Sequence, residues 1–212
     1  NSVHQKVLSL ANKEQRGYIT PQEFNLFADL AQREIFEQYF YDKNQFMRVN
    51  GNDGEYSDII HNLNEKIAIF ESVSSTSATT GNEVDIDADD LWRLGTVYDA
   101  VEQVELKPTN KRPVYVRVGE KTISCFPSAI PANLACTYVR TPKKPTWGYV
   151  VINSRAMHDA DSSVTTNFEL HSSEENELVY KILKLAGLSM KRDDLAKGGQ
   201  GLESMQVQQE KQ

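Results

Sequence analysis

The stretch TPQEFNLFADLAQREIFEQYF, residues 20–40, contains the clearest helix start in this chain of 212 residues. Thr20 can act as the N-cap, Pro21 suits the first helical position, and Glu23 can complete a capping box. Apolar side chains then recur about every 3.6 residues, at Phe24, Phe27, Ala28, Ala31, Ile35, Phe36, Tyr39 and Phe40. We predict an amphipathic helix whose aromatic face packs in the core or, alternatively, lies partly against another subunit.

Helical spacing of apolar residues continues on both sides of this stretch. It is present before residue 20 and again after the turn-forming residues 50–54, at Ile59, Leu63, Ile67 and Phe70. The sequence therefore predicts a helical region over residues 1–73. Its second and third helices are expected to be antiparallel neighbours, because the loop between them is short.

The pattern changes after residue 73. Small polar residues predict a linker over residues 74–83, and short Val-, Ile- and Tyr-rich segments separated by Gly and Pro follow. These segments predict an antiparallel β-domain over residues 84–153, either a small sandwich or a barrel. A loop and a C-terminal helix are expected over residues 154–190, with Ser172 and Glu175 as a second capping box, before an extended polar tail over 191–212. The expected fold class is α+β.

The composition is typical of a soluble globular chain, with 39% hydrophobic and 25% charged residues. The longest apolar runs, such as Tyr149–Ile152, are far shorter than the roughly 20 residues of a membrane-spanning helix. We therefore expect no membrane segment and no signal peptide. Cys125 and Cys136 have no CxxC spacing and are expected to be buried as small apolar side chains.

The net charge of −7 hides a strong segregation of charge along the chain. Residues 74–103 have a net charge of −6, whereas residues 104–148 have a net charge of +6. Oppositely charged faces can guide the association of neighbouring subunits. The predicted subunit contacts are the basic residues Arg112, Arg117, Arg140, Lys143 and Lys144 against the acidic residues Asp85, Asp87, Asp89 and Asp90.

Motifs that carry chemistry are not found in the sequence. There is no HExxH, GxSxG or phosphate-binding loop, and the four histidines lie in different predicted elements. The run Asp85–Asp90 has carboxylates at alternate positions but lacks the Gly and Glu of a calcium loop, so its cation binding is left open. We expect no catalytic residues, no metal and no cofactor.

Two other classes of function stay open on the sequence. Tyr115, Tyr138 and Trp147 are interleaved with basic residues, as in a β-domain that binds a glycan or a single-stranded nucleic acid. A hydrolase whose catalytic residues are dispersed along the chain is the remaining alternative.

Several segments resemble virion structural proteins of marine and gut bacteriophages, including crAss-like phages. They are VLSLANKEQRGYITPQEFNLFA (7–28), EIFEQYFYD (34–42), PVYVR (113–117), YVRTPKKPTW (138–147) and EENELVYKILKLAG (174–187). The order of helical region, β-domain and C-terminal helix is also similar to head-to-tail adaptors of short-tailed phages.

The resemblance implies a non-enzymatic head-to-tail connector in the neck of a virion, assembled in the host cytoplasm. Its expected partners are the portal protein and other tail or neck proteins. It would form a homo-oligomeric ring of about a dozen copies, through which DNA passes without specific binding. No site residues follow from this resemblance, because no motif residues can be matched one to one.

Overall fold

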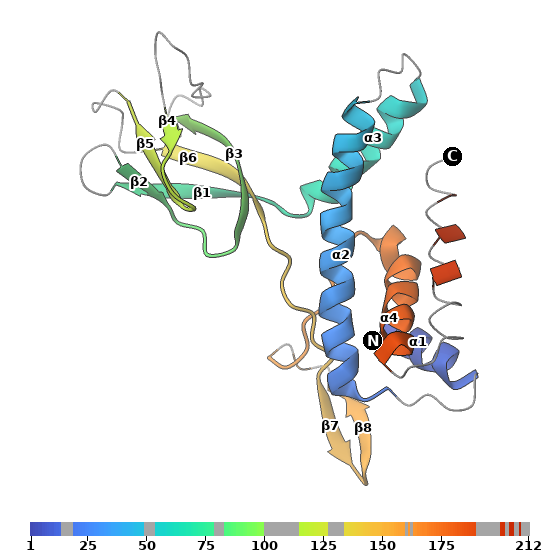
Figure 1. Ribbon diagram of the computed structural model, residues 1–212. Helices are drawn as coiled ribbons and strands as arrows, with labels where there is room; N and C mark the ends of the chain where they lie inside the picture. The colour runs from blue at the N-terminus through green and yellow to red at the C-terminus, as the bar shows by residue number, and fades with distance from the viewer. Residues whose placement is uncertain are drawn as a thin grey trace. The chain divides into compact units, whose positions relative to one another are not determined.

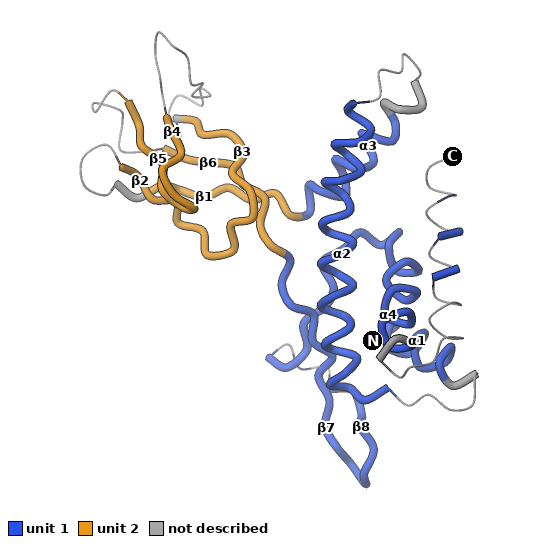
Figure 2. Tube along the Cα trace, in the orientation of Figure 1, with its two compact units in different colours: residues 1–69, 142–212 blue, residues 70–141 orange. Residues whose placement is uncertain are grey.

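The computed structural model describes residues 1–13, 19–48, 54–78, 83–99, 115–126, 134–159, 161, 163–189, 200–201, 204–205 and 208. It confirms the α+β fold class, with four α-helices and a curled six-stranded antiparallel sheet in the described ranges (Figure 1). The chain divides into two compact units (Figure 2). Residues 1–69 and 142–212 form the first, which we call the helical unit, and residues 70–141 form the second, the sheet unit.

The helical unit is built around one long helix. In chain order its elements are α1 (Ser2–Lys13), α2 (Pro21–Arg48), α3 (Gly54–Ala68), β7 (Tyr149–Ile152), β8 (Arg155–His158), η1 (Ser172–Glu174) and α4 (Glu175–Ser189). The 28 residues of α2 correspond to a length of about 42 Å. This helix packs against α3 and α4, and α1 packs against α4. The helical N-terminal region predicted from the sequence is therefore confirmed.

The start of α2 has the predicted capping box. The Thr20 backbone N–H donates to Glu23 Oε2 over 2.9 Å, and the Glu23 backbone N–H donates to Thr20 Oγ1 over 3.3 Å. The hydrogen bond from the Thr20 backbone lowers the pKa of the Glu23 carboxyl. The aromatic stripe is largely buried within the unit, which supports its interpretation as core: Phe24, Phe27, Phe36 and Tyr39 are buried.

The second capping box does not form as predicted. His171 is the N-cap of η1, and its side chain accepts a hydrogen bond from the Ser173 backbone N–H. Glu175 instead accepts a hydrogen bond from Ser2 Oγ and lies 3.2 Å from Lys6 Nζ. The carboxylate therefore links α4 to α1, because tertiary contacts offer it stronger partners than the local backbone.

The sheet unit contains β1 (Glu71–Ala78), β2 (Glu83–Ile86), β3 (Leu91–Asp99), β4 (Tyr115–Arg117), β5 (Thr122–Cys125) and β6 (Leu134–Arg140). The strand order is β3-β6-β1-β2-β5-β4, and every neighbouring pair is antiparallel. The inner face holds an apolar core: Ile86, Ala88, Leu91, Val97, Ile123, Cys125, Leu134, Cys136 and Tyr138. Burial raises the pKa of both cysteine thiols, as expected for small apolar side chains in a core.

Strand β1 occupies part of the stretch predicted as a linker. Residues 74–78 pair with β2 and β6 in the middle of the sheet, so the predicted linker over 74–83 does not match the strand pattern. The hydroxyl of Ser74 donates to the backbone carbonyl of Asp87 over 2.7 Å, and that of Thr76 donates to the carbonyl of Leu134 over 2.9 Å. A small polar strand can be central because its inward hydroxyls are satisfied by backbone carbonyls.

The predicted β-domain boundaries of 84 and 153 also differ from the structure. The sheet unit ends at Thr141, and β7 pairs with β8 in a two-stranded sheet that belongs to the helical unit. The two residues between these strands, Asn153 and Ser154, have φ angles of 49° and 62°. Positive φ at both central residues is the backbone that tight two-residue hairpins require. The tail over 191–212 lies mostly outside the described residues.

Candidate assembly surfaces

The four predicted acidic residues lie on β2 and the turn that follows it. Thr122 Oγ1 donates to Asp85 Oδ1 over 2.7 Å, Lys121 Nζ lies 3.0 Å from Asp89 Oδ1, and Tyr138 donates its hydroxyl proton to Asp90 over 3.2 Å. Asp87 is exposed. Three of the four carboxylates therefore already have partners inside the sheet unit.

The predicted basic residues do not form one surface. Arg117 and Arg140 belong to the sheet unit, whereas Lys143 and Lys144 belong to the helical unit. Arg112 lies outside the described residues. The Arg117 guanidinium donates to the backbone carbonyls of its own β4–β5 turn, and Arg140 lies over the Phe70 ring at 5.8 Å. Of the predicted basic residues, Arg117 and Arg140 thus lie in the sheet unit, on β4 and β6, with three strands between them in the sheet order.

Lys143 and Lys144 lie on an extended segment, residues 142–148, that runs antiparallel along α2 and leads into β7. Two side-chain amides of α2 hold this segment by its backbone. Asn25 both donates to the Trp147 carbonyl and accepts from its N–H, over 3.3 and 2.7 Å. About two helical turns further along α2, Gln32 donates to the Lys143 carbonyl over 2.8 Å. Both lysine side chains are exposed.

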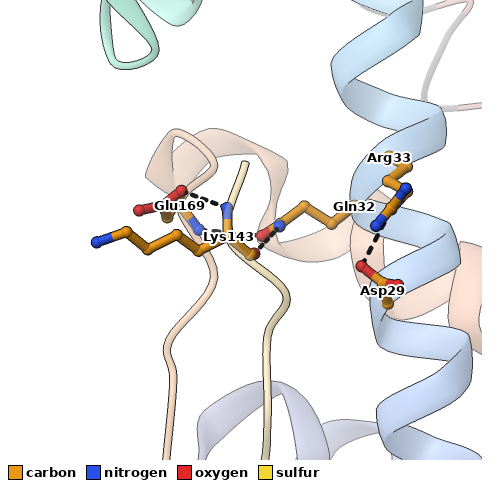
Figure 3. A network of polar contacts seen from close by, with 5 residues as sticks. All are labelled: Asp29, Gln32, Arg33, Lys143 and Glu169. Carbon is orange, nitrogen blue, oxygen red and sulfur yellow. Dashed lines mark hydrogen bonds and ion pairs between the residues drawn. The ribbon is translucent and has the colours of Figure 1, made fainter. Parts of the chain in front are cut away.

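Gln32 also holds a second segment. Its Oε1 accepts from the Glu169 backbone N–H over 3.1 Å, and Glu169 Oε2 accepts from the Lys143 backbone N–H over 2.8 Å (Figure 3). Gln32 is fully buried, so its amide replaces water for two backbone groups that the fold removes from solvent. The chain entering the β7–β8 hairpin is therefore firmly attached to α2.

The base of the hairpin is an aromatic stack. The His4 ring stacks on Trp147 with centroids 3.8 Å apart, and Trp147 also stacks on His158 and Tyr149 at 5.5 and 5.9 Å. Burial lowers the pKa of His4 to about 4. The neutral ring at this site attaches α1 to the base of the hairpin.

Beyond this base, the hairpin exposes apolar side chains on both of its faces. The register pairs Val151 with Ala156 on one face, and Val150 with Met157 on the other. Val151 is 66% exposed and Met157 is 53% exposed, and Val150 and Ile152 are exposed as well. The hairpin extends beyond the N-terminal end of α2 (Figure 1). A two-stranded sheet is only marginally stable alone in water, so this one is suited to packing against another surface.

A second apolar surface lies on α2. Its solvent-facing positions follow helical spacing through Leu26, Leu30, Arg33, Glu37 and Tyr41, and Leu26 and Leu30 are 55% and 43% exposed. We call these five residues the α2 stripe. Sequence reasoning missed it because the buried face of the same helix is richer in aromatic residues. The hairpin was missed because β7 and β8 are too short to signal a separate sheet, although Asn153 is a residue that favours positive φ.

The three aromatic residues of the alternative binding surface are not brought together. Tyr138 is buried in the core of the sheet unit, and Trp147 is buried in the helical unit. Tyr115 is partly buried on β4. Base or sugar stacking needs exposed ring faces, which Tyr138 and Trp147 do not offer.

A cavity of about 400 Å³ in the helical unit is lined by α2, α3 and the residues around η1. His171 and Ser173 lie on its wall, and their side chains are 2.9 Å apart. Ser173 Oγ also donates to Glu174, so the hydroxyl sits between the histidine and the carboxylate rather than at one end. A serine triad needs the histidine in the middle, so this arrangement is a helix cap. Among the described residues, no three His, Cys, Asp or Glu side chains gather as a metal ion would need.

No protein-family model matches the chain, and no curated protein matches it either. The resemblance to phage connector proteins therefore stays a prediction. Of the helices in the described ranges, none combines the length and apolar character that spanning a bilayer demands.

Proposed function

We propose that this chain is a non-enzymatic virion structural protein, a head-to-tail connector that forms a ring between a portal protein and the tail. The observation that carries the proposal is the β7–β8 hairpin, a rigidly held two-stranded sheet with apolar side chains exposed on both faces. Such a surface is costly in water and favours a protein that another chain completes.

The distribution of surface features supports an assembly of repeated head-to-tail contacts, as in a ring. A ring subunit uses heterologous contacts, for which it needs two different complementary surfaces. The helical unit has two, the hairpin and the α2 stripe. The overall charge of −7 suits a channel for DNA better than a site that binds it, because a negative wall repels a polyanion.

The structure changes which charged residues we propose as subunit contacts. Asp85, Asp89 and Asp90 have partners in their own unit, and Asp87 is exposed. Lys143 and Lys144 are exposed on the segment that leads into the hairpin. We therefore place the stronger candidate for subunit contact in the helical unit. Binding of a glycan or single-stranded nucleic acid gains no support, because Tyr138 and Trp147 are buried.

The proposal is tested by observing the assembly directly. Mass photometry and negative-stain microscopy of the purified chain, alone and mixed with a cognate portal protein, are expected to show rings of about a dozen copies. The mixture matters because a connector subunit can stay monomeric until a portal nucleates the ring. A chain that stays monomeric in both samples, or that binds an oligonucleotide stoichiometrically as a monomer, would contradict the proposal.

A further inference from the structure

We propose that the β7–β8 hairpin of one copy of this chain docks onto the α2 stripe of a second copy. This contact rests on the proposed ring function, and it names the two surfaces that would join neighbouring subunits. Both surfaces lie in the helical unit, so the proposed contact involves one compact unit of each copy.

The hairpin provides the projecting partner of the contact. Its apolar side chains are exposed on both faces, while its base is held by the His4–Trp147 stack and by the Asn25 amide. The exposed apolar groups thus lie on a backbone that is already ordered. Docking such a preorganised element costs less conformational entropy than docking a free loop.

The α2 stripe provides the receiving surface. Leu26 and Leu30 are exposed on the solvent side of a helix that is otherwise anchored by its aromatic face. Since Val151 of the hairpin is exposed in the same copy, the hairpin and the stripe do not cover each other within one subunit. Each is therefore available to another copy.

The charges of the two surfaces are complementary. Residues 142–158, which include the hairpin, contain Lys143, Lys144 and Arg155 and no acidic residue, giving a net charge of +3. On the α2 stripe, Arg33 forms an ion pair with Asp29, and the exposed Glu37 provides the negative charge that would face the hairpin. Opposite potentials favour this pairing over hairpin-to-hairpin contact, in which the positive charges would repel.

The dimensions of the two surfaces also agree. Each strand of the hairpin has four residues, about 13 Å in length. The distance along α2 from Leu26 to Glu37 is about 16 Å, so one hairpin can cover both leucines and reach the acidic position. Because the two surfaces differ, the contact is head-to-tail and can propagate into a ring.

A disulfide trapping experiment tests the contact without depending on ring closure. One chain has Val151→Cys and the other has Leu30→Cys, and the native Cys125 and Cys136 are buried. On mild oxidation, the mixture of the two chains is expected to form a covalent heterodimer, and neither chain alone is expected to do so. His61→Cys, an exposed position on α3, is the control and should not cross-link to Val151→Cys.

A charge exchange tests the same contact by affinity. Arg155→Glu is expected to weaken self-association in sedimentation velocity at least tenfold, and adding Glu37→Arg is expected to restore most of it. Circular dichroism of each variant establishes that the fold is retained. Restoration by the second change is the readout that mere destabilisation of the hairpin would not produce.

The outcomes separate this contact from the ring proposal. Rings that form without a Val151–Leu30 cross-link would overturn the contact and leave the connector function standing. Cross-linking of Val151→Cys with itself would also overturn it, in favour of hairpin pairing. A specific Val151–Leu30 cross-link from a chain that never forms rings, with or without a portal, would support the contact and overturn the connector function. If neither the cross-link nor a ring forms, both the contact and the connector function are overturned.

Discussion

The side-chain amide of Gln32 donates a hydrogen bond from Nε2 to the backbone carbonyl of Lys143 over 2.8 Å, although 111 residues separate the two in the chain. The same amide accepts from the backbone N–H of Glu169. One buried side chain thereby joins three distant parts of the helical unit, and it holds the segment that leads into the exposed hairpin.

Replacing Gln32 by Leu keeps the size of the side chain but leaves two backbone groups, the Lys143 carbonyl and the Glu169 N–H, without their partner. Each such orphaned group costs about 1–3 kcal/mol, so the free energy of unfolding should fall by about 2 kcal/mol or more. Urea unfolding in a Trp92→Phe background measures this, because Trp147 is then the only tryptophan. Gln45→Leu, at an exposed position of α2, is the control; equal unfolding free energies for the two variants would contradict the role of Gln32.

His4 is expected to make the helical unit less stable as the pH falls. Its pKa is about 4 in the folded protein and 6.5 in a free side chain, so the unfolded chain binds the proton first. The free energy of unfolding should therefore decrease between pH 6.5 and 4, by at most about 1.4 kcal/mol per pH unit.

His4→Phe should remove this slope, whereas the exposed His61→Gln should retain it. Urea unfolding at several pH values from 7 to 5 compares them. This window avoids the carboxyl groups of Glu23 and Glu175, whose lowered pKa values make their contributions disappear only below about pH 4.5. The same slope in the His4→Phe variant and the wild type would show that another group titrates.

Gly95 allows β3 and β6 to approach closely in the sheet unit. A Cβ at this position would lie 2.7 Å from Thr137 Oγ1 and 2.9 Å from the Thr137 backbone oxygen. Gly95→Ala should therefore destabilise the sheet by about 1–3 kcal/mol. Hydrogen exchange measured by mass spectrometry should become faster in β3 and β6. Gly119→Ala, whose Cβ would lie 3.5 Å from its nearest neighbour, should leave exchange nearly unchanged; similar exchange in both variants would refute the steric argument.

The ion pair between Lys66 and Glu174 is buried, with Glu174 only 1% exposed. Lys66→Met would leave that carboxylate buried without its cation, at a cost of about 3–5 kcal/mol. Adding Glu174→Gln should recover most of the loss. The exposed pair Lys6–Glu175 is the comparison, and Lys6→Met should cost less than about 1 kcal/mol. Urea unfolding of the wild type and these three variants measures the losses; a double variant as unstable as Lys66→Met would contradict this explanation.

Local sequence signals were reliable where the chemistry is local. The Thr20–Glu23 capping box and the aromatic stripe of α2 were predicted from spacing alone, because both depend on residues within a few turns of one helix. By contrast, His171 replaced Ser172 as a cap, because Glu175 found Ser2 and Lys6 on α1. Strand β1 went unrecognised since its burial consists of hydroxyl groups bonded to distant carbonyls.

The charge pattern shows the same division between features set by local sequence and features set by distant partners. The sequence by itself determined the helical region, the α+β class, the buried cysteines and the opposite charges of neighbouring segments, since these follow from composition and periodicity. Only the tertiary structure decided that Lys143 and Lys144 belong with α2 while Arg117 and Arg140 belong with the sheet, and that β7 and β8 form a separate apolar hairpin. The physical reason is that long-range hydrogen bonds from side-chain amides to backbone groups, such as those of Asn25 and Gln32, assign a segment to its unit, and such partners leave no local pattern in the sequence.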